Sequence, residues 1–357
     1  MKLLSHSLIV VVLFSMFIQK HVLAQDTIDI KAIEKKMDKY MTYFSGENPG
    51  AVISVMKRGD IVFERAYGLA NIETKIPMTV DMVFNLENIS KSFTSIAIMM
   101  LVEKGKLNLD NNLPDIFKDF PVYGEQVKIR YLLNHTSGLK SYDSDSLNTN
   151  NDVIGFLEGQ NQTYFESGSK FKYSNSEYLV LAKIIEEVSK LSYQEFMNKF
   201  IFKKLKIENV FLNSTNAQNI NLAIGHFKEN NEYSPEMKYS QVYGEQGIFM
   251  SANNFAKWNK ALYTNKLLSC EYLSKIFTVN IIDEKRPNYY GFGWVLMERK
   301  ETRYYWHGGL GNGYSTLVLH LPDTDVTVLI LTNRNDGYDF LKMSIYIAKL
   351  FDKELKL

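Results

Sequence analysis

Strand signals at both ends of the chain, with helical signals between them, constrain the fold most. Residues 51–68, AVISVMKRGDIVFERAYG, contain two β-rich runs joined around Arg58-Gly59-Asp60, the pattern of a hairpin. Four more β-branched and aromatic runs follow late in the chain: YGFGWVLMER, TRYYWHGG, GYSTLVLHLPD and DVTVLILTNRN. Residues 90–245 are mostly helical in pattern. This order predicts an α+β fold interrupted by a helical insertion.

Apolar spacing predicts three particular helices. Residues 28–44 carry an amphipathic stripe, SFTSIAIMMLVEKG carries a second that Gly105 would end, and Phe340 to Phe351 carries a last one. The polar stretches SYDSDSLNTNND and KENNEYSPEMKYS are expected to be surface loops or lids.

Residues 1–24 have the pattern of a secretory signal peptide. Lys2 is followed by the apolar core SLIVVVLFSMF and by Val22-Leu23-Ala24 at the cleavage positions. A membrane anchor is the alternative, but the apolar run is about a dozen residues long, whereas a spanning helix needs roughly 20. We therefore expect an exported protein, secreted or periplasmic, without a stable membrane anchor after signal removal.

Charge and cysteine content limit the partners. The formal net charge is +1 at pH 7, and no basic cluster stands out, which argues against a nucleic-acid partner. Cys270 is the only cysteine, so no internal disulfide can form, and we expect it to be a small half-buried residue rather than a reactive thiol.

The stretch FNLENISKSFTS, residues 84–95, carries a pair of positions typical of acyl-transfer chemistry. A nucleophile and a lysine three residues apart on a helix share one face, so the ammonium can lower the pKa of the nucleophile and relay its proton. In this chain that spacing joins position 88 to Lys91. The residue at position 88 is Asn88, not serine.

Over nearly its whole length after residue 24, the chain resembles the serine β-lactamases and DD-peptidases, in particular the class C β-lactamase and esterase-like branch. Five ordered strings carry the resemblance: Asn88-Ile89-Ser90-Lys91, LLNHTSGL at 132–139, Tyr173-Ser174-Asn175, YGFGW at 290–294 and His307-Gly308-Gly309. The resemblance implies an antiparallel sheet flanked by helices, a helical lobe, and an active site between them. The implied α/β lobe spans about 25–88 and 246–357, and the helical lobe about 89–245.

The resemblance also implies roles for individual residues. Lys91 would relay the proton, Tyr173 would act as general base and acid, and His307 would line the strand beside the scissile bond. Substrate contacts would come from Asn175, Gly309 and Leu310. The backbone N–H groups of residues 88 and 310 would form an oxyanion hole.

Asn88 departs from this pattern where a side-chain nucleophile is needed. A carboxamide is not a useful nucleophile, because its nitrogen lone pair is delocalised, and losing such a nucleophile can cost on the order of 10⁶ in turnover. Ser90 lies roughly 200° around the helix from position 88, and Ser92 lies one turn deeper. Glu87 could act as a replacement base on water, but we expect an exposed or salt-bridged carboxylate at the helix start.

Other candidate residues favour structural roles. His135 is expected to be a hydrogen-bonded structural histidine. His226 and His320 have no partner at metal-binding spacing, so neither a metal nor another cofactor is expected. GGLGNG, residues 308–313, lies between two strand signals and predicts a hairpin turn rather than a phosphate loop. We expect Tyr304, Tyr305 and Trp306 to pack on the sheet.

Two functions follow. The first is an exported ligand-recognition protein on a hydrolase scaffold, which binds a small molecule or peptide such as a cell-wall-like peptide, ester or lactam but does not acylate. The second is an active amide or ester hydrolase that uses water or an unrecognised nucleophile. A purely structural role has no positive support, and a monomer is expected by default.

Overall fold

The computed structural model describes residues 29–142, 146–212, 221–236, 241–279 and 289–357. The segment expected to be a signal peptide lies outside these residues. Helix α2 (Ile30–Tyr40) and the 3₁₀ turn η1 (Met41–Phe44) occupy the range where a helix was predicted. Residues 40–357 form one compact unit, which contains all the features below.

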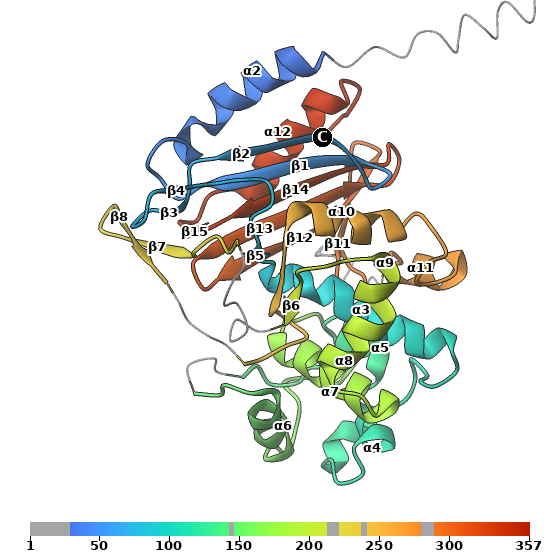
Figure 1. The fold of residues 1–357 in the computed structure, drawn as a ribbon. Helices are drawn as coiled ribbons and strands as arrows, with labels where there is room; N and C mark the ends of the chain where they lie inside the picture. The colour runs from blue at the N-terminus through green and yellow to red at the C-terminus, as the bar shows by residue number, and fades with distance from the viewer. Residues whose placement is uncertain (1–28, 143–145, 213–220, 237–240, 280–288) are drawn as a thin grey trace, which may run out of the picture. The chain divides into compact units, whose positions relative to one another are not determined.

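A seven-stranded antiparallel sheet dominates this unit (Figure 1). Strands from the two ends of the chain meet within it, because β1 pairs with β14 over the register Ala51↔Thr332 to Lys57↔Val326. In spatial order the strands are β10 (Tyr289–Tyr290), β11 (Val295–Arg299), β12 (Thr302–Gly311), β13 (Tyr314–Leu321), β14 (Val326–Thr332), β1 (Ala51–Lys57) and β2 (Asp60–Tyr67). The α+β class is confirmed.

Two predicted hairpins are confirmed, and both use two-residue turns with positive φ. Arg58 (φ 52°) and Gly59 (φ 79°) join β1 to β2, and Asn312 (φ 47°) and Gly313 (φ 77°) join β12 to β13. Positive φ at both central residues matches the twist of the flanking strands. GGLGNG therefore ends in a hairpin turn, as predicted.

Helices cover both faces of this sheet. Every residue of β13 and β14 is buried, a pattern that requires cover on both sides. Helix α12 (Phe340–Phe351), whose bounds match the prediction, packs against β13 and β14. Helix α10 (Ala252–Ala261) packs against β1 and β2.

The middle of the chain forms the helices drawn from cyan to yellow-green in Figure 1. Helix α3 is buried at every position from Ser90 to Leu101 and ends before Gly105 (φ 64°), as predicted. It packs against α7 and α11. These helices are α3 (Ser90–Glu103), α4 (Leu113–Ile116), α5 (Ile129–Leu133), α6 (Asn150–Glu158), α7 (Asn175–Ser189), α8 (Tyr193–Met197) and α9 (Lys203–Leu205), with 3₁₀ turns η2 (Glu87–Ile89) and η3 (Val122–Gln126) and the π turn η4 (Asn198–Phe202). Helix α11 (Cys270–Ile276) follows later in the chain and is orange in Figure 1.

Short strands complete the fold and correct one prediction. KENNEYSPEMKYS was expected to be a loop or lid, but its first part forms the hairpin β7 (His226–Glu229) and β8 (Glu232–Pro235). Asn230 and Asn231, at φ 49° and 66°, make its turn. The other short strands are β3 (Leu69–Asn71), β4 (Ile76–Pro77), β5 (Phe84–Asn85), β6 (Phe211–Leu212), β9 (Ile248–Met250) and β15 (Arg334–Asn335).

Cys270 is exposed rather than half-buried, because it opens α11 at the surface, where its Sγ lies 3.1 Å from Asn265 Oδ1. Over the part of the chain that the structure describes, no helix has the length and apolar character needed to cross a membrane.

Candidate active site

The turn η2 runs directly into α3 and brings Asn88 and Lys91 to a common carboxylate. Asn88 Nδ2 donates to Glu245 Oε2 at 2.8 Å, and Lys91 Nζ donates to the same oxygen at 3.2 Å. Sequence analysis did not identify Glu245. It lies just before β9 in the string YGEQGIF, which has no recognisable motif spacing, so only the fold places it here.

Lys91 has all three of its ammonium donors occupied. Besides Glu245 Oε2, they reach Asn175 Oδ1 at 2.8 Å and the Glu245 main-chain oxygen at 3.4 Å. Asn175 is the first residue of α7, so this helix and α3 meet at the site. Burial lowers the pKa of Lys91 to about 8, although Glu245 opposes the shift.

Tyr173 lies beside this cluster without joining its hydrogen bonds. Its ring centroid is 5.1 Å from Lys91 Nζ, and 39% of its surface is exposed. Among the described residues, no hydrogen bond links its hydroxyl to Lys91. Desolvation, together with the carboxylates of Glu245 and Glu177, raises the pKa of Tyr173 well above 10. At neutral pH its hydroxyl is therefore protonated, and its role as a general base stays a prediction.

Glu245 is held from both sides. Its second oxygen, Oε1, accepts from Tyr142 Oη at 2.9 Å, and the residue is 1% exposed. Glu245 thus neutralises the buried ammonium of Lys91 and holds the carboxamide of Asn88 by a hydrogen bond.

The neighbouring hydroxyls are engaged elsewhere, as the helix geometry predicted. Ser92 Oγ donates to the Ile89 carbonyl at 2.7 Å, and Ser90 Oγ accepts from the Ile248 N–H at 3.3 Å. Both serines are completely buried. Neither is placed to replace a nucleophile at position 88.

Glu87 is not the exposed or salt-bridged carboxylate that was expected. It is 1% exposed, and its Oε1 accepts from Asn85 Nδ2 at 2.6 Å and from Asn312 Nδ2 at 3.1 Å. Desolvation raises its pKa to about 8, so it is mostly protonated at neutral pH. A buried, protonated carboxyl is a poor base for water, and this geometry disfavours Glu87 as a replacement base.

Strand β12 passes close to η2, and glycine makes this approach possible. A Cβ on Gly309 would lie 2.4 Å from Glu87 Cβ and 2.9 Å from the Asn88 nitrogen. The next residue, Leu310, is 59% exposed. The structure therefore brings positions 88, 309 and 310 together, while the oxyanion-hole role of the N–H groups of residues 88 and 310 stays a prediction.

His307 is buried on β12 and held in one tautomer. Its Nδ1 lies 2.9 Å from the Gly308 carbonyl, which can only accept, so Nδ1 carries the proton. Its Nε2 then accepts from Tyr290 Oη at 3.0 Å. Burial, with Lys91 nearby, lowers the pKa of His307 to about 3. The ring is therefore neutral at physiological pH.

His135 takes the structural place that was expected. It is fully buried with φ 61°, and its Nδ1 contacts Glu177 Oε2. Glu177 also accepts from the N–H and hydroxyl of Ser137. The second ring nitrogen, Nε2, has no hydrogen-bond partner among the described residues.

A cleft of about 560 Å³ opens above these residues. Asn88, Tyr173, His307, Gly309 and Leu310 line it. The cleft continues along β12 and β13 towards the start of α12, where its lining includes Val295, Trp306, Leu317, Tyr338, Phe340 and Leu341. Trp306 thus borders the cleft in addition to packing on the sheet.

Comparisons with known proteins agree with this architecture. The family described as Beta-lactamase matches residues 30–350. The chain belongs to the Beta-lactamase family.

Among curated relatives of this family, Penicillin-binding protein 4* of Bacillus subtilis is 29% identical, covering 79% of this chain and 67% of the relative. Protein flp of Staphylococcus aureus strain MW2 is 25% identical, covering 82% and 61%. The chain thus spans about two thirds or less of the length of these relatives.

Solved structures of the fold are also similar. The octameric penicillin-binding protein homologue from Pyrococcus abyssi has a TM-score of 0.81 and 26% identity, covering 90% of this chain and 77% of that one. FmtA from Staphylococcus aureus, at 20% identity, has a TM-score of 0.75 and covers 91% and 89%. The second likeness concerns the fold alone.

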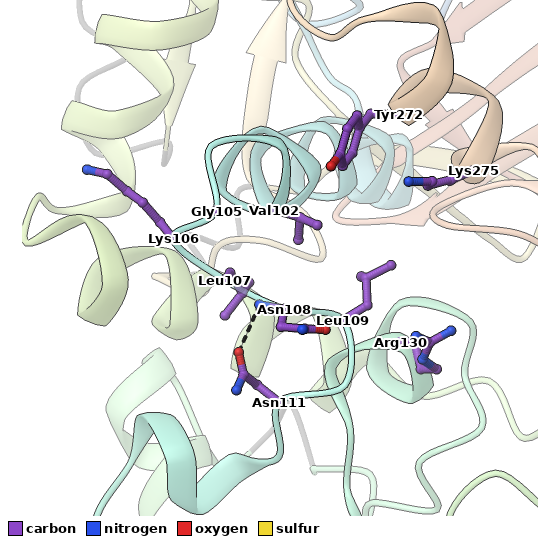
Figure 2. Close-up of a pocket in the computed structure, with 10 residues that line it drawn as sticks. All are labelled: Val102, Gly105, Lys106, Leu107, Asn108, Leu109, Asn111, Arg130, Tyr272 and Lys275. Atoms are coloured by element: carbon purple, nitrogen blue, oxygen red, sulfur yellow. Dashed lines mark hydrogen bonds between the residues drawn. The ribbon is translucent and has the colours of Figure 1, made fainter.

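A separate hollow of about 450 Å³ lies away from the residues that resemble the family's motifs (Figure 2). It is lined by the segment after α3, where Asn108 N donates to Asn111 Oδ1 at 2.8 Å, and by Arg130 and Lys275. Arg130 pairs with Asp110 and Lys275 with Glu271. Within the described residues, no group of His, Cys, Asp or Glu could hold a metal ion.

Proposed function

We propose that this Beta-lactamase family member is an exported recognition protein that is impaired in acyl transfer. It binds a cell-wall-like peptide, an ester or a lactam in the cleft beside Asn88. One observation carries the proposal: Asn88 Nδ2 and Lys91 Nζ both donate to Glu245 Oε2. Position 88 offers no hydroxyl, and the lysine that would take its proton is engaged in a buried ion pair.

The cleft supports retained binding. Its volume of about 560 Å³ is within the usual range for small-molecule sites. The side chains that resemble the family's motifs, Lys91, Asn175 and His307, are held by hydrogen bonds in a defined geometry. A rigid site of this kind loses little entropy when a ligand binds.

Active hydrolysis remains the second candidate, since Lys91, Tyr173 and Asn175 are all present. Water-assisted attack would need an accessible base. Glu245 is 1% exposed and its two carboxylate oxygens accept three hydrogen bonds, so it meets this requirement poorly. Glu87 is buried and mostly protonated at neutral pH. These observations favour recognition over hydrolysis.

The test combines labelling and turnover. Purified protein is incubated with a fluorophosphonate, a fluorescent penicillin and a chromogenic short-chain ester, followed by intact-mass measurement. We expect no adduct and no turnover above a heat-denatured control, and stabilisation against heat by at least one peptidoglycan fragment, ester or lactam. A stoichiometric adduct or robust turnover would overturn the proposal, as would the absence of any binding.

A further inference from the structure

The lining of the cleft restricts the charge of its ligand. Among its described lining residues there is no lysine or arginine, and the only acidic one is Asp339. Asp339 is exposed, and its Oδ1 accepts from the Lys342 N–H at 3.0 Å at the start of α12. Lys91 does not supply an accessible cation, because it is 0% exposed and paired with Glu245.

His307 does not supply a positive charge either. Its Nδ1–H is directed to the Gly308 carbonyl and its Nε2 to Tyr290, and the ring is neutral at physiological pH. A ligand carboxylate would therefore lose water in this cleft without gaining an opposite charge, a transfer that is unfavourable. An uncharged ester or amide avoids this cost.

The wall of the cleft has a small hollow at Gly308. Gly308 pairs with Leu317 in the sheet register, and its missing side chain leaves space between Trp306 and Leu317. A Cβ built on Gly308 would lie 3.6 Å from Trp306 Cζ3 and 3.9 Å from Leu317 Cδ1, which are ordinary contacts. The position therefore has room for one carbon atom without any movement of the strand, and Phe340 and Leu341 line the same cleft.

We propose that the cleft selects an uncharged ester or amide that carries a bulky apolar group, which lies in the hollow beside Gly308 between β12 and α12. The ligand class thus excludes peptides and lactams whose carboxylate would have to enter the cleft. This inference rests on the proposed recognition function and narrows its ligand.

Four matched ligands test the inference. They are D-alanyl-D-alanine derivatives with a phenylacetyl or an acetyl cap and a terminal carboxamide or carboxylate, titrated calorimetrically onto the purified protein. We expect the phenylacetyl carboxamide to bind best. Changing its carboxamide to carboxylate weakens binding at least about tenfold, and changing phenylacetyl to acetyl has an effect of similar size.

Two variants locate the effects. Gly308→Leu fills the hollow, so it should remove the preference for phenylacetyl over acetyl. Gly308→Ala, with a smaller side chain, should remove part of the preference for phenylacetyl. It replaces Gly308→Leu in the experiment if that variant does not fold. Leu310→Lys adds a cation at an exposed position of the cleft and should reduce the penalty for the carboxylate several-fold.

The outcomes test the ligand selectivity of the cleft separately from the recognition function. If the carboxylates bind within about twofold of the carboxamides, the cleft does not select against charge. If a folded Gly308→Leu or Gly308→Ala variant keeps the full phenylacetyl preference, the apolar group does not lie beside Gly308. In both cases recognition itself would stand. If none of the ligands used here or in the labelling test binds, the recognition function fails, and this inference fails with it.

Discussion

Glu245 Oε2 lies 3.2 Å from Lys91 Nζ, and both side chains are almost completely excluded from solvent. Like the missing hydroxyl at Asn88, this ion pair makes the site unsuited to acyl transfer. It holds the lysine protonated, while a proton-accepting lysine needs its neutral form.

Restoring the hydroxyl alone should restore little chemistry. We expect Asn88→Ser to react slowly with a fluorophosphonate. Asn88→Ser combined with Glu245→Gln should react about tenfold faster near pH 7, because removing the carboxylate lowers the pKa of Lys91 by about two units and makes the lysine mostly neutral. Stopped-flow labelling or time-resolved intact mass measures both rates. Equal rates would show that Glu245 does not restrain Lys91.

Breaking the pair should be costly for the folded state. Glu245→Gln leaves a buried ammonium without its counterion, so we expect the free energy of unfolding to fall by about 3–5 kcal/mol. Urea denaturation followed by circular dichroism measures the change. Glu271→Gln is the matched control: its partner Lys275 is 2.9 Å away on the surface of α11, and the expected change is below about 0.5 kcal/mol. Similar losses for both variants would contradict the argument.

Glu87 should give stability a distinct pH dependence. Its pKa is raised to about 8 in the folded protein from an ordinary 4.5, so between these values the folded state binds the extra proton. Stability from this group is therefore largest at low pH and is lost as pH rises towards 8, with a slope of at most about 1.4 kcal/mol per pH unit.

The variant Glu87→Gln isolates this contribution. Its stability relative to the unmodified protein should increase from pH 5 to pH 8 in paired urea denaturation series. Lys91 acts separately, because its lowered pKa makes stability rise with pH between about 8 and 10.5. A difference between the two proteins that stays constant from pH 5 to 8 would show that Glu87 is not buried in its protonated form.

Two adjacent glycines should respond very differently to alanine. Gly309→Ala places a Cβ 2.4 Å from Glu87 Cβ, whereas the nearest atom to a Cβ on Gly308 is 3.5 Å away. We expect Gly309→Ala to cost about 1–3 kcal/mol through overpacking, and Gly308→Ala to change the free energy of unfolding by less than about 0.5 kcal/mol. Thermal and chemical denaturation compare the pair. Equal costs would mean that β12 does not approach η2 as closely as described.

The sequence predicted the elements whose signals are local. Helix α12 has the expected bounds, and the turns at Arg58-Gly59 and Asn312-Gly313 have the expected form, because period and turn chemistry lie within a few residues. The β7–β8 hairpin was missed although its Asn230-Asn231 turn was a usable signal. The ordered motifs implied that Lys91 and Asn175 belong to one site, but their direct hydrogen bond across 84 residues was not predicted.

The electrostatic environment of the site depended on contacts that no local pattern shows. Glu245 is 154 residues from Lys91 along the chain, and Asn312 is 225 residues from Glu87. An acidic residue in a short polar string is ordinarily expected at the surface. Burial beside a particular donor becomes visible only when the fold brings the two segments together.

The pairing of β1 with β14 also bears on how the chain is made. Ala51 meets Thr332 in the sheet, so during synthesis the β1–β2 hairpin is complete long before its neighbour leaves the ribosome. Until then one edge of β1 has no hydrogen-bonding partner, and unpaired strand edges favour association with other chains. Folding yield should therefore depend on protection of residues 51–57 while the remaining sequence is translated.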